Sequence, residues 1–218
     1  MSFNEASDPL KKARTGADGS AVGAMLGVEA APRSGGGSEA SRTSTFARSA
    51  SREGRVDMAS GYTMIDVGGK AVTRRRALAC GRIDLGQGAY PLVRDGKLPK
   101  GDALSLAEVA GILAAKKVDQ LIPLCHPLGL DQVALAFDPD DEALAVTVFC
   151  QVVTSGRTGV EMEALAGVNL ALLTIWDLSK PIEAALGIGG VRLLKKEGGT
   201  SGTWVHPDGL PPLPERFR

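Results

Sequence analysis

The stretch that decides the fold reads Thr158-Gly-Val-Glu-Met-Glu-Ala-Leu-Ala-Gly-Val-Asn-Leu-Ala-Leu-Leu-Thr-Ile-Trp-Asp-Leu-Ser-Lys180. Thr158 and Glu161 fit a capping box, which predicts a helix that opens there and runs to about Ser179. Its large apolar residues fall on more than one face, and a helix of this kind is buried on two sides. Because one sheet covers only one side, we expect a second chain to cover the other.

The flanking sequence predicts alternating strands and helices. We expect strands over residues 73–85, 131–137, 144–153 and 191–195, and helices over 89–94, 105–117 and from Pro181 to near Gly187. A second capping box, Ser105 to Glu108, opens the 105–117 helix, and residues 138–141 form a hairpin turn. This order, β-α-β-β-α-β with extra short helices, is typical of a ferredoxin-like α+β sandwich, here assembling as an oligomer.

The first part of the chain differs in composition from the rest. Residues 1–58 are rich in Ser, Gly, Ala and Arg and hold too few apolar residues to offset the entropy of ordering. They also contain acids, whereas organellar transit peptides are acid-poor. We therefore expect a disordered extension over 1–58, a folded domain over 59–202 and a C-terminal tail over 203–218.

Composition argues against several classes of function. Lys plus Arg total 25 and so do Asp plus Glu, so a net charge of zero predicts no general affinity for nucleic acid or membrane. The apolar run over residues 164–176 is expected to be too short to span a bilayer. Cys80, Cys125 and Cys150 form no CxxC pair, which suits a reducing, cytoplasmic compartment. No histidine pair has metal-ligand spacing, so we expect no structural or catalytic zinc site. We assign no metal ligand and no cofactor.

Polar residues interrupt apolar or glycine-punctuated sequence in four places. These are Lys100-Gly-Asp102, residues 121–128 with His126, residues 159–165 with Glu163, and Asp177-Leu-Ser-Lys180. A lysine before a helix N-terminus can meet a phosphate, and a histidine held extended between prolines suits proton transfer near neutral pH. Taken singly, each also fits a structural role: a solvated lysine, a hydrogen-bonded histidine, a capping-box Glu161, or a surface Asp177–Lys180 ion pair.

Helix geometry places two of these residues far apart. Glu163 and Asp177 differ by an angle of about 40° around one helix but by roughly 21 Å along it. One small ligand can hardly touch both ends of a straight helix. If both ends serve one site, we expect symmetry-related chains to combine opposite ends across an interface.

In this order and spacing, the segments resemble the MoaC family of cyclic pyranopterin monophosphate synthases. The resemblance covers residues 62–202, in the stretches 64–71 (MIDVGGKA), 100–102 (KGD), 107–116 (AEVAGILAAK), 121–128 (LIPLCHPL), 158–165 (TGVEMEAL), 173–180 (LTIWDLSK) and 191–202 (VRLLKKEGGTSG). It implies a cytoplasmic lyase that converts 3′,8-cyclo-7,8-dihydroguanosine triphosphate to cyclic pyranopterin monophosphate and diphosphate. It also implies a homohexamer, a trimer of dimers with sites at subunit interfaces.

The resemblance assigns roles by motif. Asp177 matches the catalytic aspartate of the family, with Lys100, Lys180 and His126 as its catalytic companions. The substrate-contacting positions are Leu124, Cys125, His126, Met162 and Glu163, together with Lys116 among the active-site lysines and Arg75 near the triphosphate. The chain departs from the family pattern at Trp176 and Ser179, where tyrosine and cysteine are usual, and at Pro181.

Two other classes of function are alternatives to an enzyme. An RNA-recognition module shares the expected strand order, but it needs exposed aromatic and basic residues on its central strands. Residues 133–136 and 146–150 offer one phenylalanine and no lysine. The second alternative is a structural oligomer without activity, derived from the same family.

Overall fold

The computed structural model describes residues 61–218, which form a sheet of strands covered by helices. The expected extension over 1–58 lies outside these residues. The elements are β1 (Thr73–Asp84), α1 (Gly86–Arg94), α2 (Ala103–Ala115), α3 (Val118–Leu121), β2 (Gln132–Asp140), β3 (Ala145–Gly156), α4 (Glu161–Ser179), β4 (Gly187–Glu197), β5 (Trp204–Val205) and the 3-10 helix η1 (Glu215–Phe217). All four expected strands and three of the four expected helices are present, with shifted ends.

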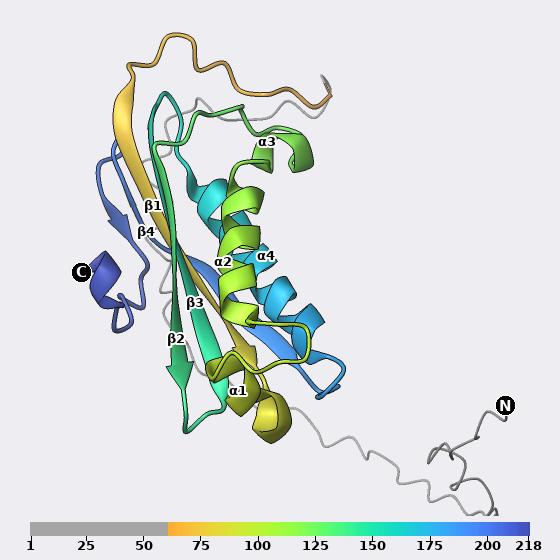
Figure 1. The fold of residues 1–218 in the computed structure, drawn as a ribbon. Helices are drawn as coiled ribbons and strands as arrows, with labels where there is room; N and C mark the ends of the chain where they lie inside the picture. Colours follow the sequence, from red (N-terminus) through yellow and green to blue (C-terminus); the bar gives the residue numbers. More distant parts are fainter. Residues whose placement is uncertain (1–60) are drawn as a thin grey trace, which may run out of the picture. The chain divides into compact units, whose positions relative to one another are not determined.

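The sheet has the order β2-β3-β1-β4-β5, and each neighbouring pair is antiparallel. Helices α2 and α4 lie side by side on one face of the sheet, and the chain after β5 lies on the other (Figure 1). Helix α4 packs on β1, β3 and β4, whereas α2 packs on α4 and β2. The expected combination of helices and an antiparallel sheet is confirmed.

Strand β1 serves two separate cores. Ala77, Ala79 and Ile83 belong to the large core between the sheet and the helices. Leu78 and Cys80 point to the opposite face and belong to a small cluster there. Side chains alternate between the two faces of a strand, so β1 is buried on both faces. Its middle is therefore a continuous apolar run and does not alternate between polar and apolar residues.

Two glycines let α2 and α4 approach each other closely. A Cβ at Gly111 would lie 2.5 Å from Leu135 Cδ2 and 2.8 Å from the carbonyl oxygen of Gly167. A Cβ at Gly167 would lie 2.6 Å from Cys150 Sγ. Distances this short leave no room for a side chain, so α2 and α4 contact through backbone at these glycines, and Leu135 and Cys150 of the sheet pack directly against them.

Helix α4 is a core helix with one exposed stripe. Val168, Leu172 and Ile175 are fully buried, whereas Leu170 and Leu173 are exposed. On length and composition α4 passes as a candidate membrane span, so the expectation that this run is too short was wrong. The expectation considered only the apolar run over 164–176, whereas the candidate span is the whole helix, Glu161–Ser179. Half of its most apolar window is buried inside the fold, as in a core helix.

Both expected capping boxes were wrong. Helix α2 is capped by Asp102, whose carboxylate accepts hydrogen bonds from the backbone N–H groups of Leu104 (3.0 Å) and Ser105 (3.2 Å). An aspartate in this position is as good a cap as serine and starts the helix earlier. Helix α4 begins after Val160, with no side-chain cap from Thr158.

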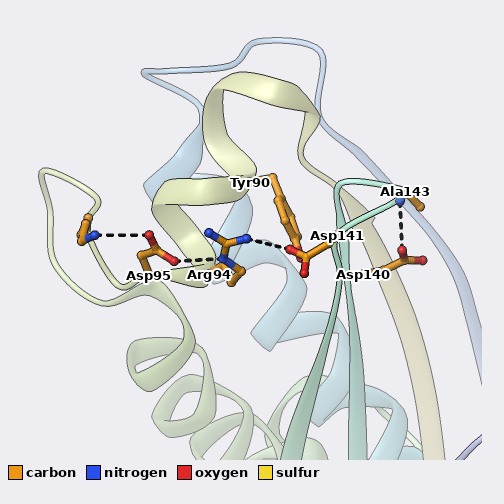
Figure 2. A network of polar contacts seen from close by, with 7 residues as sticks. Tyr90, Arg94, Asp95, Asp140, Asp141 and Ala143 are labelled. Atoms are coloured by element: carbon orange, nitrogen blue, oxygen red, sulfur yellow. Dashed lines mark hydrogen bonds and ion pairs between the residues drawn. The ribbon is translucent and has the colours of Figure 1, made fainter.

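The hairpin turn lies later than the expected residues 138–141. Strand β2 continues to Asp140, and residues 141–144 form the turn. Figure 2 shows why this turn is fixed: Asp141 Oδ1 accepts hydrogen bonds from Tyr90 Oη (2.9 Å) and Arg94 Nη1 (2.7 Å) of α1. Asp141 therefore fastens the turn to α1.

The expected helix after Pro181 was also wrong. The carbonyl oxygen of Ser179 accepts hydrogen bonds from the N–H groups of Ile182 (2.9 Å) and Glu183 (3.1 Å), which closes a turn. No helix follows within the described residues before β4 begins at Gly187. Pro181 has no N–H to donate, so it cannot continue the helical hydrogen-bond pattern of α4.

Candidate active site

Three charged side chains meet at the C-terminal end of α4. Lys180 Nζ lies 2.6 Å from Asp177 Oδ1, and Lys100 Nζ lies 3.6 Å from Asp177 Oδ2. Asp177 and Lys180 lie one helical turn apart, while Lys100 comes from the loop between α1 and α2. All three side chains are about half exposed, so a ligand can reach them.

This cluster, Lys100–Asp177–Lys180, holds its carboxylate ionised. The hydrogen bond from Lys180 lowers the pKa of Asp177 most, and the charge of Lys100 lowers it further. Lys180 Nζ also lies 5.8 Å from the centre of the Trp176 ring, within cation–π range. Trp176, which stands where the family usually has tyrosine, therefore keeps an aromatic ring beside the cluster.

The loop that carries Lys100 is fixed at both sides. Before it, Leu98 is buried in the large core, and its carbonyl oxygen accepts a hydrogen bond from the N–H of Gly101 (2.9 Å). After it, the Asp102 cap ties the loop to α2. The Lys100-Gly-Asp102 motif thus combines one charge for a ligand with one residue that fixes the loop.

A second group of predicted residues lies at the other end of α4. His126 Nε2 lies 2.8 Å from the carbonyl oxygen of Ile65, which assigns the proton of the neutral ring to Nε2 and leaves Nδ1 as an acceptor. Glu163 is buried, and burial raises the pKa of its carboxyl. Burial also raises the pKa of Cys125, and the charges of Glu163 and Asp119 raise it further. Cys125 is therefore a protonated thiol and no ready nucleophile.

Exposed side chains surround this second group. Leu124 and Met162 are exposed although apolar, and Lys116 is exposed at the C-cap of α2. Leu124 also lines an apolar hollow of about 440 Å³ together with Tyr62. Exposed apolar side chains next to buried polar groups are typical of a surface that receives a flat ring.

A cleft of about 510 Å³ opens at the same end. It is lined by Gly69, Lys70, Ala71, Thr73, Arg75, Arg76, Gly159, Glu161, Lys196, Glu197, Gly198, Gly199, Thr200 and Ser201. Arg75 is held from behind: its Nε and Nη2 donate to the carbonyl oxygens of Gly156 and Arg157, both at 3.0 Å. Its remaining N–H groups stay available to a ligand, and a guanidinium with fixed direction suits an anion.

Strand β4 directs a second cation toward the cleft. The pairing of β1 with β4 shifts between Leu78 and Ala79, where a β-bulge interrupts the alternation. As a result, Leu194 and Lys195 both face the side away from the helices, and Lys196 lies 3.1 Å from Glu161 at the start of α4. A bulge commonly re-aims a side chain in this way at a binding site.

Gly199 closes the cleft around Arg75. It has a positive φ of 73°, and a Cβ there would lie 2.5 Å from Arg75 Nη1. A glycine lets the backbone of this loop lie directly against the guanidinium. The Gly198-Gly199 pair therefore shapes the cleft as well as following the end of β4.

The predicted site residues thus form two groups in one chain. The first is the Lys100–Asp177–Lys180 cluster, and the second contains Arg75, Lys116, Leu124, Cys125, His126, Met162 and Glu163. Helix α4 runs between them, and its rise of about 1.5 Å per residue separates Glu163 from Asp177 by roughly 21 Å. The two carboxylates lie at similar angles around the helix but differ in environment. Glu163 is buried, whereas Asp177 is about half exposed.

The sequence alone did not single out Lys70, Lys196 or Glu161 as cleft residues. Glu161 was assigned to a capping box, yet its carboxylate faces Lys196 in the cleft. A signal for the two lysines was present, because both fall in stretches that carry the family resemblance. Among residues 61–218, no group of three or more His, Cys, Asp or Glu side chains is placed to hold a metal ion.

Comparison with known proteins identifies the family of this chain. A model described as "MoaC family" matches residues 64–199. A cyclic pyranopterin monophosphate synthase of Chloroflexus aurantiacus is 47% identical over 152 residues, which cover 70% of this chain and 93% of that protein. Its counterpart in Chloroflexus aggregans is 45% identical over 153 residues, with the same coverage. A molybdenum cofactor biosynthesis bifunctional protein of Synechococcus elongatus is 51% identical over 144 residues, 66% of this chain and 45% of that protein. The chain belongs to the MoaC family.

Proposed function

We propose that the protein is a cyclic pyranopterin monophosphate synthase of molybdopterin biosynthesis. In this proposal it is a lyase that converts 3′,8-cyclo-7,8-dihydroguanosine triphosphate to cyclic pyranopterin monophosphate and diphosphate. The observation that carries the proposal is the convergence of Lys100 and Lys180 on Asp177, in a chain whose relatives bear this name. No cofactor or metal is required by the proposal.

The cleft suits the triphosphate of such a substrate. Arg75, Lys70 and Lys196 supply three cations, and Arg75 is already oriented by two backbone carbonyls. Charge-assisted hydrogen bonds from fixed cations bind phosphate oxygens and stabilise the charge that develops on a departing diphosphate. Glu161 pairs with Lys196 in the absence of substrate, so the bound phosphate would take over that cation.

The remaining residues suit the rearrangement of the purine ring. Breaking and closing a ring needs groups that give and take protons at fixed positions. Asp177 is ionised and can accept a proton, while the two lysines beside it can donate one. His126 offers Nδ1 as an acceptor at the other end of α4. In the proposal, Leu124, Cys125, Met162 and Glu163 contact the ring, and Lys116 adds a further cation.

Two chains are needed to complete one site in this proposal. Apolar side chains are exposed on α2 (Leu106, Val109 and Leu113) and on α4 (Leu170 and Leu173), forming a face that a partner would cover. Around a twofold axis, antiparallel copies of α4 place the Asp177 end of one chain beside the Glu163 end of the other. We propose a dimer of this kind as the unit of a hexamer.

The type of fold and the limits of the domains are also part of the proposal. A ferredoxin-like arrangement is supported by the antiparallel order β4-β1-β3-β2, to which β5 adds one further strand. We propose a catalytic domain over 59–202 and a tail over 203–218, in a cytoplasmic enzyme with a small-molecule substrate and with neither nucleic acid nor membrane as a partner.

Incubation with the cyclised triphosphate tests the proposal. The full chain should release diphosphate and form a product that oxidises to a fluorescent pterin. Lys97→Ala is the matched control for Lys100→Ala, because Lys97 lies in the same loop and pairs with Asp95 instead of Asp177. Turnover by the control and none by Lys100→Ala supports the site. No diphosphate from the full chain contradicts the proposed function.

A further inference from the structure

The chain after β5 crosses the face of the sheet that the helices leave open. We call residues 206–218 the C-terminal strap. It begins beside β4, where the N–H of His206 donates to the carbonyl oxygen of Leu194 (2.9 Å), and it ends in η1 near β2 at the other edge (Figure 1). The match to the family model ends at residue 199, before the strap begins.

Apolar and polar contacts both hold the strap. Leu213 and Phe217 pack on a small buried cluster made of Leu78, Cys80, Phe149 and Leu194. Arg216 Nη1 donates to the carbonyl oxygen of Leu135 on the edge strand β2 (2.7 Å) and also contacts Glu108 Oε1 (3.2 Å). An edge strand covered in this way has fewer free groups for another chain to pair with.

The strap also covers an ion-paired group that forms one wall of the cleft. Glu197 lies between two cations: Arg76 Nε is 2.5 Å from Oε2, and Lys195 Nζ is 2.6 Å from Oε1. Arg76 and Glu197 line the substrate cleft, and with Leu213 and Phe217 they also line a small cavity of about 50 Å³ under the strap. One wall therefore separates the strap from the cleft.

We propose that the C-terminal strap is a positioning element for the substrate cleft. Packed on Leu78 and over Lys195, it holds the Arg76–Glu197 pair in place and so fixes the wall that faces the triphosphate. Surface ion pairs of this kind are loosely held when both side chains are free in water. Apolar cover along the stems of arginine and lysine reduces that freedom. The inference rests on the proposed function for its substrate.

Phe217→Ala in the full chain tests the proposal, with Glu215→Ala as the matched control. Glu215 lies in the same 3-10 helix, and its side chain is exposed. Loss of the Phe217 contact should raise KM for the cyclised triphosphate roughly two- to fivefold and leave kcat unchanged. A loss of folded protein would instead lower kcat and leave KM unchanged. The control should match the unaltered chain.

Cys80 reports whether the strap has moved. It is buried under the strap, whereas Cys150 lies in the large core, where burial raises its pKa to about 12. In a Cys125→Ser background, Leu213→Ala/Phe217→Ala should make Cys80 reactive toward a thiol reagent while Cys150 stays protected. Cys80 that stays protected in this double variant would overturn the proposal, because these side chains would then not hold the strap.

A second probe separates this inference from the proposed function. The affinity for diphosphate, measured by calorimetry, does not depend on turnover. We expect Phe217→Ala to weaken diphosphate binding by the same roughly two- to fivefold, and Glu215→Ala to leave it unchanged. Reactive Cys80 shows that the strap has moved. If KM and the affinity for diphosphate are nevertheless unchanged in such a variant, the strap does not position the cleft. A full chain that binds diphosphate but gives no turnover counts against the proposed function alone.

Discussion

Lys100 and Asp177 come together within a single chain, with Nζ 3.6 Å from Oδ2, although they lie in different halves of the domain. Lys180 joins them from the next turn of α4. Two cations around one carboxylate leave one positive charge in excess, which suits a site for an anionic substrate. If both residues belong to one functional site, as we propose, that site takes Lys100 and Asp177 from the same subunit.

Removing either charge should abolish turnover without unfolding the protein. We expect Lys100→Ala and Asp177→Asn each to lower kcat by roughly 100-fold or more, because pre-placed charges act mainly on the transition state. Both side chains are half exposed and fill no core space, so the melting temperature should change little. Diphosphate release and thermal unfolding measure the two effects, and near-normal turnover in folded variants would refute the assignment.

Arg75 should act mainly on substrate affinity. Its guanidinium is fixed by Gly156 and Arg157, so Arg75→Ala removes an oriented donor from the cleft. We expect KM to rise roughly 10- to 100-fold, as for loss of a hydrogen bond to a charged group. Arg75→Lys should restore little, because a lysine cannot make both backbone contacts and still present further donors. Full recovery by lysine would show that only the charge matters.

Glu163 should make stability depend on pH. Burial raises its pKa in the folded state, so the folded protein favours the neutral carboxyl. The stability linked to this group is present below the ordinary pKa of a glutamate and is lost as pH rises through the raised pKa. Glu163→Gln keeps a neutral group at all pH values. It should therefore raise the melting temperature at pH 7 but not at pH 4, while reducing turnover. An equal effect at both pH values would argue against a buried charge.

The contact between α2 and α4 should be intolerant of added volume. Gly111→Ala would place a methyl group 2.5 Å from Leu135 Cδ2, and relieving such overpacking costs about 1–3 kcal/mol of unfolding free energy. Gly129→Ala is the control, since a Cβ there meets nothing within 4 Å. Urea unfolding gives both values. Equal stability of the two variants would show that the helices can separate at little cost.

The pattern of apolar residues predicted the order of the four long strands and of α1, α2 and α4 correctly, but it also predicted a helix after Pro181 that is not formed. The ends of the elements depended on competing local groups. Asp102 and Ser105 are both residue types that cap helices. Asp102 is the cap in the structure, because its carboxylate accepts hydrogen bonds from the backbone N–H groups of Leu104 and Ser105. The turn moved past Asp140 because Tyr90 and Arg94 bind Asp141, a contact between distant segments (Figure 2). Local propensity contains no information about such partners.

The candidate site was predicted in part for a similar reason. Residues within one motif, such as Asp177 and Lys180, were found because helix spacing places them together. The cleft around Lys196 was missed because its direction depends on a β-bulge in the pairing with β1, and pairing register is a property of the folded sheet. The strap was missed because its anchors, Leu213 and Phe217, give no periodic pattern in a proline-rich tail.

The most direct test of a site shared between two chains is activity after mixing inactive variants from opposite ends of α4. Asp177→Asn and His126→Ala are each expected to be inactive. If each site takes Asp177 from one subunit and His126 from another, random subunit exchange should restore about one quarter of the sites. Lys100→Ala mixed with Asp177→Asn should restore none, because these residues share a chain. The account predicts that activity recovers only in the mixture of Asp177→Asn with His126→Ala. No recovery in that mixture, when labelled subunits show that exchange has occurred, would contradict a site shared between two chains.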